Sequence, residues 1–359
     1  MVAIAGYAAY AYYSGLPPAG TTVLVVYTYP SLFGGNCGPP TNVSAQVFAP
    51  FEQAHDASIQ LECPAGNLAS TLIAEKNAPG ADLVIGLDEI TASEAYADGV
   101  LVPYAPPNLA NVSSRLVDAL SPNHAATPYE WGYLGIDYNA TFAASTRGAV
   151  ANSSFPAFAE NSTWAHQLLI EDPITDITGE EFLVWEVEFY QQVEHTANWQ
   201  DWWKSVDPHI QVAPDWGTAF NEFTTPGGPQ MVVSYTTDPA YAAFSGSPGA
   251  FNSTVSTANG TAYGWETIYG IGIVAGTHHL ALDQEFVNWF LDGRVQGQIP
   301  TNEWEYPANR TVALPPVYAA TIDPTTILPL NAAVNATTLF TNLTANWLPQ
   351  WQELFNEYG

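Results

Sequence analysis

The fold class follows from the stretch Ala81-Asp82-Leu83-Val84-Ile85-Gly86-Leu87-Asp88. Its centre is apolar, and it ends in a carboxylate. An apolar run of this length is typical of a strand that is covered on both faces, as in a parallel sheet flanked by helices. The stretch therefore predicts an α/β fold.

The segments before this strand alternate between the periods of strand and helix. Residues 22–29 are rich in β-branched side chains and stop at Pro30, as a strand would, and residues 58–61 form a second short strand. Helical patterns cover residues 45–55 and 68–77. Alternating strands and helices favour a mainly parallel sheet with flanking helices.

A second set of elements begins after Pro128. We predict strands at 133–138, 168–171, 231–235 and 268–274, and helices at 180–193, 197–204, 283–291 and 342–356. The Ser, Thr, Asn and Gly-rich segment 245–261 predicts a surface loop. In parallel sheets, ligands bind beyond the carboxyl ends of the strands, so the tyrosine, aspartate and threonine residues that end several strands point to the site.

The charge composition is unusual. Of 359 residues only 11% are charged and six are Lys or Arg, which gives a formal charge of -29, whereas roughly 25% charged residues is ordinary. In acid the remaining positive groups are six Lys and Arg plus seven His, thirteen in all, so self-repulsion stays small. We favour an acidic exterior over high salt. Nucleic acid is excluded as a partner because no basic stripe exists to neutralise phosphates.

Two features place the chain outside the cytoplasm. Residues 2–16 form an apolar run too short to span a bilayer comfortably, so residues 1–20 are predicted to be the remnant of a signal or an anchor. The sequence also holds ten glycosylation sequons, at Asn42, Asn111, Asn139, Asn152, Asn161, Asn252, Asn259, Asn309, Asn335 and Asn342. We expect an extracellular, cell-surface or periplasmic glycoprotein.

The two cysteines, Cys37 and Cys63, are expected to form one disulfide in an oxidising exterior. The alternative is a pair of buried free thiols. Two cysteines are too few for an all-cysteine zinc site, and no metal site is predicted.

Six segments together resemble the successive motifs of the periplasmic thiamine-binding proteins of ABC importers. They occur in the same order and at nearly the same spacing between about Thr22 and Pro316. The segments are Val26–Ser31, Ala81–Asp88, Pro128–Tyr133, Glu171–Thr175, Val233–Tyr241 and Ile299–Pro307.

This resemblance implies a two-lobed class II periplasmic-binding-protein fold, with mainly parallel sheets, flanking helices and a ligand cleft between the lobes. Residues 21–127 with 267–359 would form lobe 1, and residues 128–266 lobe 2. The resemblance also implies thiamine or a thiamine phosphate as ligand, an ABC permease and an ATPase as partners, no cofactor, and a secreted or membrane-tethered protein, which we expect to be a monomer.

Thiamine is a permanent cation, and aromatic faces and carboxylates both stabilise cations. By resemblance, four aromatic residues match positions that line the family's site: Trp216, Tyr235, Tyr241 and Trp304. Asp88, at the end of its strand, is the acid expected to face the ligand, with a helix N-cap as the alternative role. Further polar and wall positions are Tyr27, Thr236, Thr237 and Asp238. For each aromatic residue the alternative is ordinary core packing.

The chain departs from the family at two turns that would contact phosphate. The matching positions are Ala65-Gly66 and Asp176-Ile177. The carboxylate of Asp176 repels an anion, and neither it nor Ile177 supplies a side-chain donor, so unphosphorylated thiamine is the predicted ligand.

We predict no enzymatic activity, because the sequence lacks the nucleophile-elbow, zinc-protease, dinucleotide and Walker motifs. The alternatives on the same fold are a ferric-ion carrier, a polyamine or sugar binder, and a thiamine-cleaving enzyme. The ferric carrier would need a tyrosine pair, and Tyr12-Tyr13 lies in the leader.

Overall fold

The computed structural model describes residues 20–34, 37–40, 42–140, 142, 148–206 and 208–358. The chain divides into two compact units, each described by itself below. Unit 1 holds the chain up to Glu130, then Ile268–Glu303 and Pro307–Ala313. Unit 2 holds Trp131–Thr267, Trp304–Tyr306 and Leu314–Gly359. The predicted leader, apart from Gly20, lies outside the described residues.

Unit 1 is built on a sheet with strand order β2-β1-β3-β12. β1 pairs in parallel with β2 and β3, whereas β12 runs antiparallel to β3 and to the short β4. All five residues of β3 are buried, as predicted for a strand covered on both faces. The bounds are β1 Thr22–Tyr27, β2 Ala57–Glu62, β3 Leu83–Leu87, β4 Leu101–Val102 and β12 Glu266–Val274.

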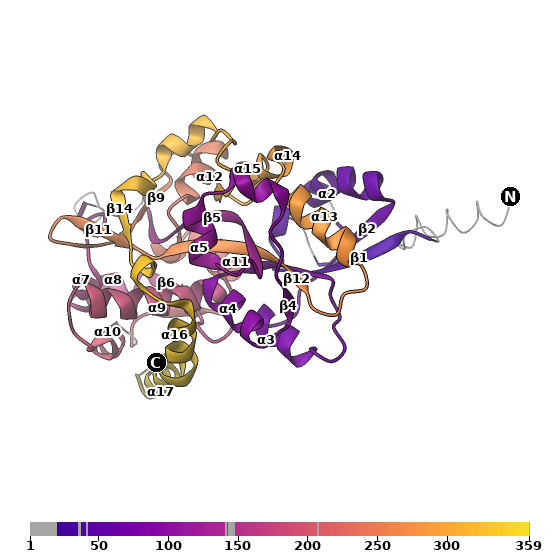
Figure 1. Ribbon diagram of the computed structural model, residues 1–359. Coiled ribbons are helices and arrows are strands. Elements are labelled where there is room, and N and C mark those ends of the chain that lie inside the picture. The colour runs from indigo at the N-terminus through magenta and orange to yellow at the C-terminus, as the bar shows by residue number, and fades with distance from the viewer. Residues whose placement is uncertain are drawn as a thin grey trace. The chain divides into compact units, whose positions relative to one another are not determined.

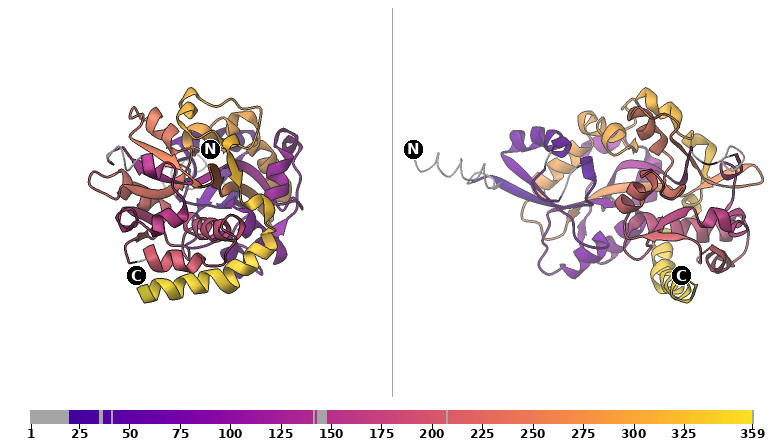
Figure 2. Two further views of the ribbon diagram at one scale, coloured as in Figure 1. Left: turned by 90° about the vertical axis from the view of Figure 1, so that its left-hand side faces the viewer. Right: turned by 180° about the vertical axis from the view of Figure 1, so that it is seen from behind.

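Helices cover both faces of this sheet, with α2 and α13 on one side and α3 and α4 on the other (Figures 1 and 2). The core on the first side is aromatic: the ring of Phe51 meets that of Phe286 edge-on at a centroid distance of 5.0 Å. The bounds are α2 Asn42–His55, α3 Leu68–Ala74, α4 Glu89–Ala97, α5 Ser114–Leu120, α13 Leu280–Phe290, α14 Gly293–Gln296 and α15 Ile299–Asn302.

The predicted disulfide is confirmed. Cys37 is bonded to Cys63, which directly follows β2, and their Cα atoms are 5.6 Å apart. The bond closes a loop across a sequence separation of 26, so it restricts the unfolded chain around α2 and β2.

Unit 2 has a sheet in the order β5-β8-β6-β7, with β9 added along β5. β8, β6 and β7 are mutually parallel, and β5 runs antiparallel to β8 and β9. The bounds are β5 Ala126–Asn139, β6 Leu168–Glu171, β7 Gln211–Ala213, β8 Met231–Tyr235 and β9 Phe251–Thr254. β6 and β8 lie at the residues that the sequence predicted, and the α/β fold class is confirmed.

The helices of unit 2 surround a core rich in tryptophan. α9 is buried along its whole middle, from Thr178 to Tyr190. Phe155 packs edge-on against Trp185 and Trp202 at centroid distances of 4.9 and 5.8 Å. The bounds are α7 Phe155–Ala159, α8 Ser162–Ala165, α9 Ile177–Gln192, α10 Trp199–Val206, α11 Trp216–Thr224 and α12 Asp238–Phe244.

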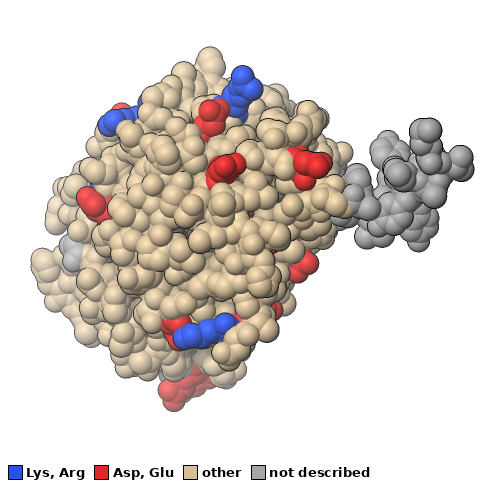
Figure 3. Space-filling view, turned by 45° about the vertical axis from the view of Figure 1, so that its right-hand side comes forward, with Lys and Arg blue, Asp and Glu red and all other residues tan. Residues whose placement is uncertain are grey.

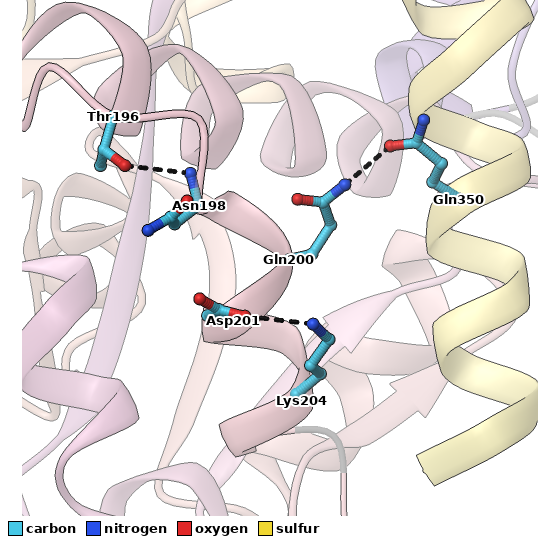
Figure 4. A network of polar contacts seen from close by, with 6 residues as sticks. All are labelled: Thr196, Asn198, Gln200, Asp201, Lys204 and Gln350. Carbon is cyan, nitrogen blue, oxygen red and sulfur yellow. Dashed lines mark hydrogen bonds and ion pairs between the residues drawn. The ribbon is translucent and has the colours of Figure 1, made fainter.

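The C-terminal segment was predicted to belong to lobe 1 but packs in unit 2. α16 (Ala336–Asn342) continues through a π-helical turn at Leu343–Trp347 into α17 (Leu348–Tyr358). Trp351 of α17 meets Trp203 of α10 edge-on at 5.8 Å, and the Gln200 amide donates to the Gln350 side-chain oxygen at 2.9 Å (Figure 4). The aromatic face of α17 is thus buried against α10, which explains the placement.

The predicted loop 245–261 is also corrected, because part of it is strand. β9 pairs with β5, and β10 (Ser256–Ala258) pairs with β11 (Thr261–Gly264), which in turn pairs with β14 (Ile327–Pro329). The serine and threonine residues that favoured a loop are compatible with strands, since threonine is β-branched.

Charged side chains are sparse on the face shown in Figure 3, where a few acidic and basic groups, some of them side by side, interrupt a mostly uncharged surface. Among the described residues, no helix combines the length and the apolar character needed to cross a bilayer.

Candidate ligand-binding site

Unit 2 contains a continuous row of aromatic rings, which we call the aromatic wall: Tyr235, Trp216, Phe220, Tyr241 and Trp304. Trp216 stacks on Phe220 with ring centroids 5.1 Å apart and meets Tyr235 at 6.3 Å. Phe220 is 6.1 Å from Tyr241, which meets Trp304 edge-on at 5.3 Å. Four members are the aromatic residues singled out in the sequence. Phe220 was missed, although its position one helical turn after Trp216 is the spacing that brings two rings together.

Local hydrogen bonds fix Trp216 at the start of α11. Asp215 caps this helix, and its carboxylate accepts the Thr218 N–H at 2.8 Å. The Trp216 backbone N–H donates to Asp176 at 3.2 Å, and the indole Nε1–H donates to the Ser234 hydroxyl at 2.9 Å. The ring is therefore held at its backbone and at its edge, while the side chain is only half-buried.

Trp304 reaches the wall from a backbone conformation that tryptophan rarely adopts. Its φ is +63°, in the left-handed region. Such a conformation costs about 1–3 kcal/mol and persists where the surroundings impose it, often at functional sites. Here the Trp304 ring packs against Tyr241 and, at 5.0 Å, against Phe244.

Buried carboxyl groups lie directly behind the wall. Asp238, at the start of α12, accepts the Ser234 hydroxyl and, at 3.2 Å, the Tyr235 backbone N–H. It also shares a hydrogen bond with Asp137 of β5. Burial raises the pKa of Asp238 to about 6, and burial together with the charge of Asp238 raises the pKa of Asp137 well above its usual range.

Two further acids lie in the same region. Glu171 ends β6 and is fully buried, and burial raises its pKa well above the usual range. Burial also raises the pKa of Asp176. Among the described residues of unit 2, Lys204 is the one Lys or Arg, and it pairs with Asp201 on its own helix at 3.1 Å (Figure 4). No lysine or arginine in the described part of unit 2 is therefore available to neutralise an acid behind the wall.

The predicted phosphate-contacting positions differ from an anion site. Asp176 caps α9, and its carboxylate accepts the Thr178 N–H at 2.9 Å as well as the Trp216 N–H. The Asp176 carboxylate thus occupies the N–H groups of Thr178 and Trp216. Ile177, the first residue of α9, adds no polar side chain. Ala65 and Gly66 form an exposed bend before α3 in unit 1, and Gly66 has a φ of +82°.

Two other predicted residues are buried in unit 2. The Thr236 N–H donates to the Tyr133 carbonyl at 2.9 Å. Thr237 is fully buried, and its hydroxyl has no hydrogen-bond partner within the described part of the chain.

The remaining predicted residues, Tyr27 and Asp88, lie in unit 1 and have structural partners there. The Tyr27 hydroxyl donates to Glu75 at 2.9 Å, and burial and this carboxylate raise the Tyr27 pKa to about 12. Asp88 is fully buried and caps α4: its carboxylate accepts the Thr91 N–H at 2.7 Å, and the Thr91 hydroxyl accepts the Asp88 N–H at 2.9 Å. The alternative capping role is the one these contacts show.

The described residues contain no group of three or more His, Cys, Asp or Glu side chains that could hold a metal ion. Both cysteines are joined in the disulfide, so neither supplies a thiolate nucleophile. Tyr12-Tyr13 lies outside the described residues.

Known proteins with similar sequences share one description. No protein-family model matches the chain. A thiamine-binding periplasmic protein of Brucella suis is 28% identical over 304 residues, which is 83% of each chain. The thiamine-binding periplasmic protein of Escherichia coli is 25% identical over 343 residues, which is 94% of each.

A solved structure shares the fold. A periplasmic thiamin binding protein superposes with a TM-score of 0.78 at 22% identity and covers 94% of this chain and 97% of its own. The periplasmic location of the relatives agrees with the location predicted from the sequence, outside the cytoplasm. The chain is thus similar in sequence to thiamine-binding periplasmic proteins and shares its fold with a periplasmic thiamin binding protein.

Proposed function

We propose that the chain captures unphosphorylated thiamine outside the cytoplasm and delivers it to the permease and ATPase of an ABC importer. The relatives at 25 to 28% identity support this ligand by name. The observation that carries the proposal is the aromatic wall in front of buried carboxyl groups in a unit with almost no basic residues.

This arrangement suits a flat organic cation. Each well-placed ring stabilises a cation by about 0.5 to 2 kcal/mol, and the half-buried faces of Trp216 and Tyr235 are held in place by Ser234, Thr178 and Asp238. An ionised carboxylate behind the rings adds attraction that buried surroundings screen poorly.

The preference for the unphosphorylated form follows from Asp176. Phosphate binding at a helix start needs free backbone N–H groups and positive potential. The Asp176 side chain already accepts the N–H groups of Thr178 and Trp216, so these donors are taken, and wherever Asp176 is ionised its charge also repels a second anion.

Calorimetric titration tests ligand and charge together. The ligands are thiamine, its monophosphate, spermidine, and an analogue in which an uncharged thiophene replaces the thiazolium. We expect thiamine to bind at least tenfold tighter than the neutral analogue, since loss of the cation–ring attraction alone costs roughly one such factor. We also expect it to bind tighter than the monophosphate, which Asp176 disfavours, and than spermidine, which has no flat ring to stack. Equal affinity of the neutral analogue would contradict the cation site. A tighter monophosphate complex would contradict the role of Asp176, and a tighter spermidine complex would favour the polyamine alternative.

The acidic exterior is part of the same proposal. The buried acids Glu130, Asp137, Glu171, Glu186 and Glu303 all have a raised pKa because burial disfavours their charge. Such groups are tolerated best when protonated, which acid ensures.

Glycan attachment is proposed only at exposed sequons. Asn309 is excluded, because its side chain is 2% exposed and its amide donates to the Leu291 carbonyl at 2.9 Å.

A further inference from the structure

Trp216 is connected to a buried acid pair by a chain of hydrogen bonds, and none of the sequence motifs assigns a role to two of its members, Ser234 and Asp137. We propose that Asp238 is a positioning residue that orients Trp216 through Ser234, and that the proton it shares with Asp137 switches on and off the negative charge behind the aromatic wall. This inference rests on the proposed function for its ligand, but the chain of hydrogen bonds can be tested without any ligand.

The first step is the direction of the bonds. An indole Nε1–H can only donate, so Ser234 must accept from Trp216, which it does at 2.9 Å. The single Ser234 proton then has to go elsewhere, and Asp238 Oδ2 accepts it. Asp238 thereby fixes the orientation of the hydroxyl that holds the indole.

The second step concerns the same carboxylate oxygen. Asp238 Oδ2 also accepts the backbone N–H of Tyr235 at 3.2 Å. One oxygen atom therefore sets the end of β8, where Tyr235 enters the wall, and the edge of the Trp216 ring. Ser234 is fully buried and Asp238 is 4% exposed, so water does not compete for these bonds.

The third step is the acid pair itself. Asp137 is fully buried, accepts the Ser253 hydroxyl and shares a hydrogen bond with Asp238. Two buried carboxyl groups in contact cannot both ionise, so one proton stays between them. Asp137 keeps it, since the donors Ser234 and Tyr235 stabilise the ionised form of Asp238 and lower its pKa against the effect of burial.

The charged surroundings set the sign of the effect. The titratable groups that interact with Asp238 from neighbouring strands are Asp137 on β5 and Glu171 on β6. Burial, with the charges of Asp176, Asp215 and Asp238, raises the pKa of Glu171 well above its usual range, so the ionisation of Asp238 disfavours a second charge on Glu171. The pair therefore carries one negative charge above about pH 6 and none well below it.

The consequence for a cationic ligand is a loss of affinity in acid. At pH 5, one unit below the pKa of about 6 for Asp238, about one protein in eleven carries the ionised pair. If only that form binds tightly, the apparent affinity at pH 5 is about tenfold weaker than at pH 8. Binding is expected to be tightest above about pH 6, and at lower pH the aromatic rings hold the ligand without the carboxylate charge, at the reduced affinity.

The ligand-free test is nuclear magnetic resonance of ¹⁵N-tryptophan-labelled protein. Of the 12 tryptophans, the Trp216 indole signal is assigned by its absence in Trp216→Phe. We expect this signal to shift with a midpoint near pH 6 in the wild type and to stop responding in Ser234→Ala. A Trp216 signal that is constant from pH 4 to 8 would overturn the relay, whatever the ligand is.

The binding test uses Asp137→Asn. An asparagine amide there donates permanently to Asp238, so the carboxylate stays ionised to lower pH. Calorimetry should show the roughly tenfold weakening of thiamine binding between pH 8 and 5 in the wild type, and much less in Asp137→Asn. Asp283→Asn is the matched control: Asp283 accepts the Thr277 hydroxyl at 2.7 Å and also has a pKa near 6, but it belongs to unit 1.

The two tests fail separately. Equal pH dependence in Asp137→Asn and the wild type, or the same change in the Asp283→Asn control, would overturn the switch. A responding Trp216 signal without thiamine binding would keep the relay and reject the proposed ligand.

Discussion

Each unit contains a buried pair of carboxyl groups, and the two pairs differ in their donors. In unit 1, Glu130 and Glu303 surround the Tyr29 hydroxyl, which lies 3.3 and 2.9 Å from their oxygens and 2.9 Å from the Tyr129 hydroxyl. In unit 2, Asp238 accepts a serine hydroxyl and a backbone N–H and shares a proton with Asp137. In both pairs, burial is the largest cause of the raised pKa of the carboxyl groups.

The difference shows what decides whether a buried acid ionises. Glu130 and Glu303 receive the hydroxyl protons of Tyr29 and Tyr129, Glu303 also accepts the Phe33 N–H, and burial raises the pKa of Glu130 to about 8. Asp238 has its own donors, and its pKa rises only to about 6. Among the described residues, no lysine, arginine or histidine hydrogen-bonds to either pair, so burial and the hydrogen-bond donors together set the pKa at which each pair ionises. The pair of unit 1 therefore serves packing at neutral pH, and the pair of unit 2 can carry charge.

A second difference between the units is the disulfide between Cys37 and Cys63, which belongs to unit 1. Its removal is expected to have the largest effect. Replacing both cysteines by serine should lower the free energy of unfolding by about 3 to 4 kcal/mol, as the loop-entropy model gives for the separation of 26. Denaturant titration monitored by tryptophan fluorescence checks this. A decrease in the free energy of unfolding of less than about 1 kcal/mol would mean that the disulfide does not restrict the unfolded chain as the model assumes.

Removing the Trp216 ring distinguishes the contribution of the aromatic wall to binding from that of the acid pair of unit 2. Trp216→Ala should weaken thiamine binding by about 2 to 4 kcal/mol, as for a central aromatic anchor of an interface. Calorimetry measures the loss, with Trp289→Ala in unit 1 as control. Unchanged affinity in Trp216→Ala would rule out the aromatic wall as the site.

The acid pair of unit 1 should make the fold more stable in acid. Because the folded pKa of Glu130 is about 8 and the unfolded value is about 4.3, its contribution is complete below about pH 4 and is lost as pH rises through 8. Melting temperatures should fall from pH 4 to pH 8 by less in Glu130→Gln than in the wild type. The wild type should stay cooperatively folded near pH 3, and loss of near-ultraviolet dichroism well above that pH would favour the high-salt alternative.

The smallest effect concerns Asp88, where capping and ligand contact predict different results. Asp88→Ala should cost about 0.5 to 2 kcal/mol of stability, since Thr91 loses its acceptor. Asp88→Asn keeps an acceptor and should cost less. If Asp88→Asn nevertheless weakened thiamine binding tenfold or more, the predicted ligand-facing role of this residue would be supported instead.

Local sequence patterns predicted where strands and helices lie in the chain better than which segments pack against them. Strands β6 and β8 were found at their predicted residues because their apolar runs are bounded by polar residues or turns on both sides. The C-terminal helix was found as well, but its partner α10 lies about 150 residues earlier, as the bond from Gln200 to Gln350 shows. Helical periodicity shows that α17 has an apolar face and not what covers it.

In the candidate site too, local motifs were easier to predict than contacts between distant segments. Motif positions identified Trp216, Tyr235, Tyr241 and Trp304, which the structure brings together in one wall. The relay was not predictable, because Asp137 approaches Asp238 only through the antiparallel pairing of β5 with β8. Asp88 shows the reverse case: its capping partner Thr91 is three residues away, so the cap could be predicted from sequence alone.

Asp176 has a consequence for how the ligand range of this protein could change. Its carboxylate is covalently attached to the chain and accepts the Thr178 N–H at the start of α9. It therefore competes for this N–H group with any external anion. A group tethered at short range acts at an effective concentration of about millimolar or more, far above that of a dilute phosphate ester in the surroundings. The proposed exclusion of phosphorylated ligands therefore needs no obstructing wall. A single substitution that shortens this side chain is expected to free the N–H groups of Thr178 and Trp216 for an external anion.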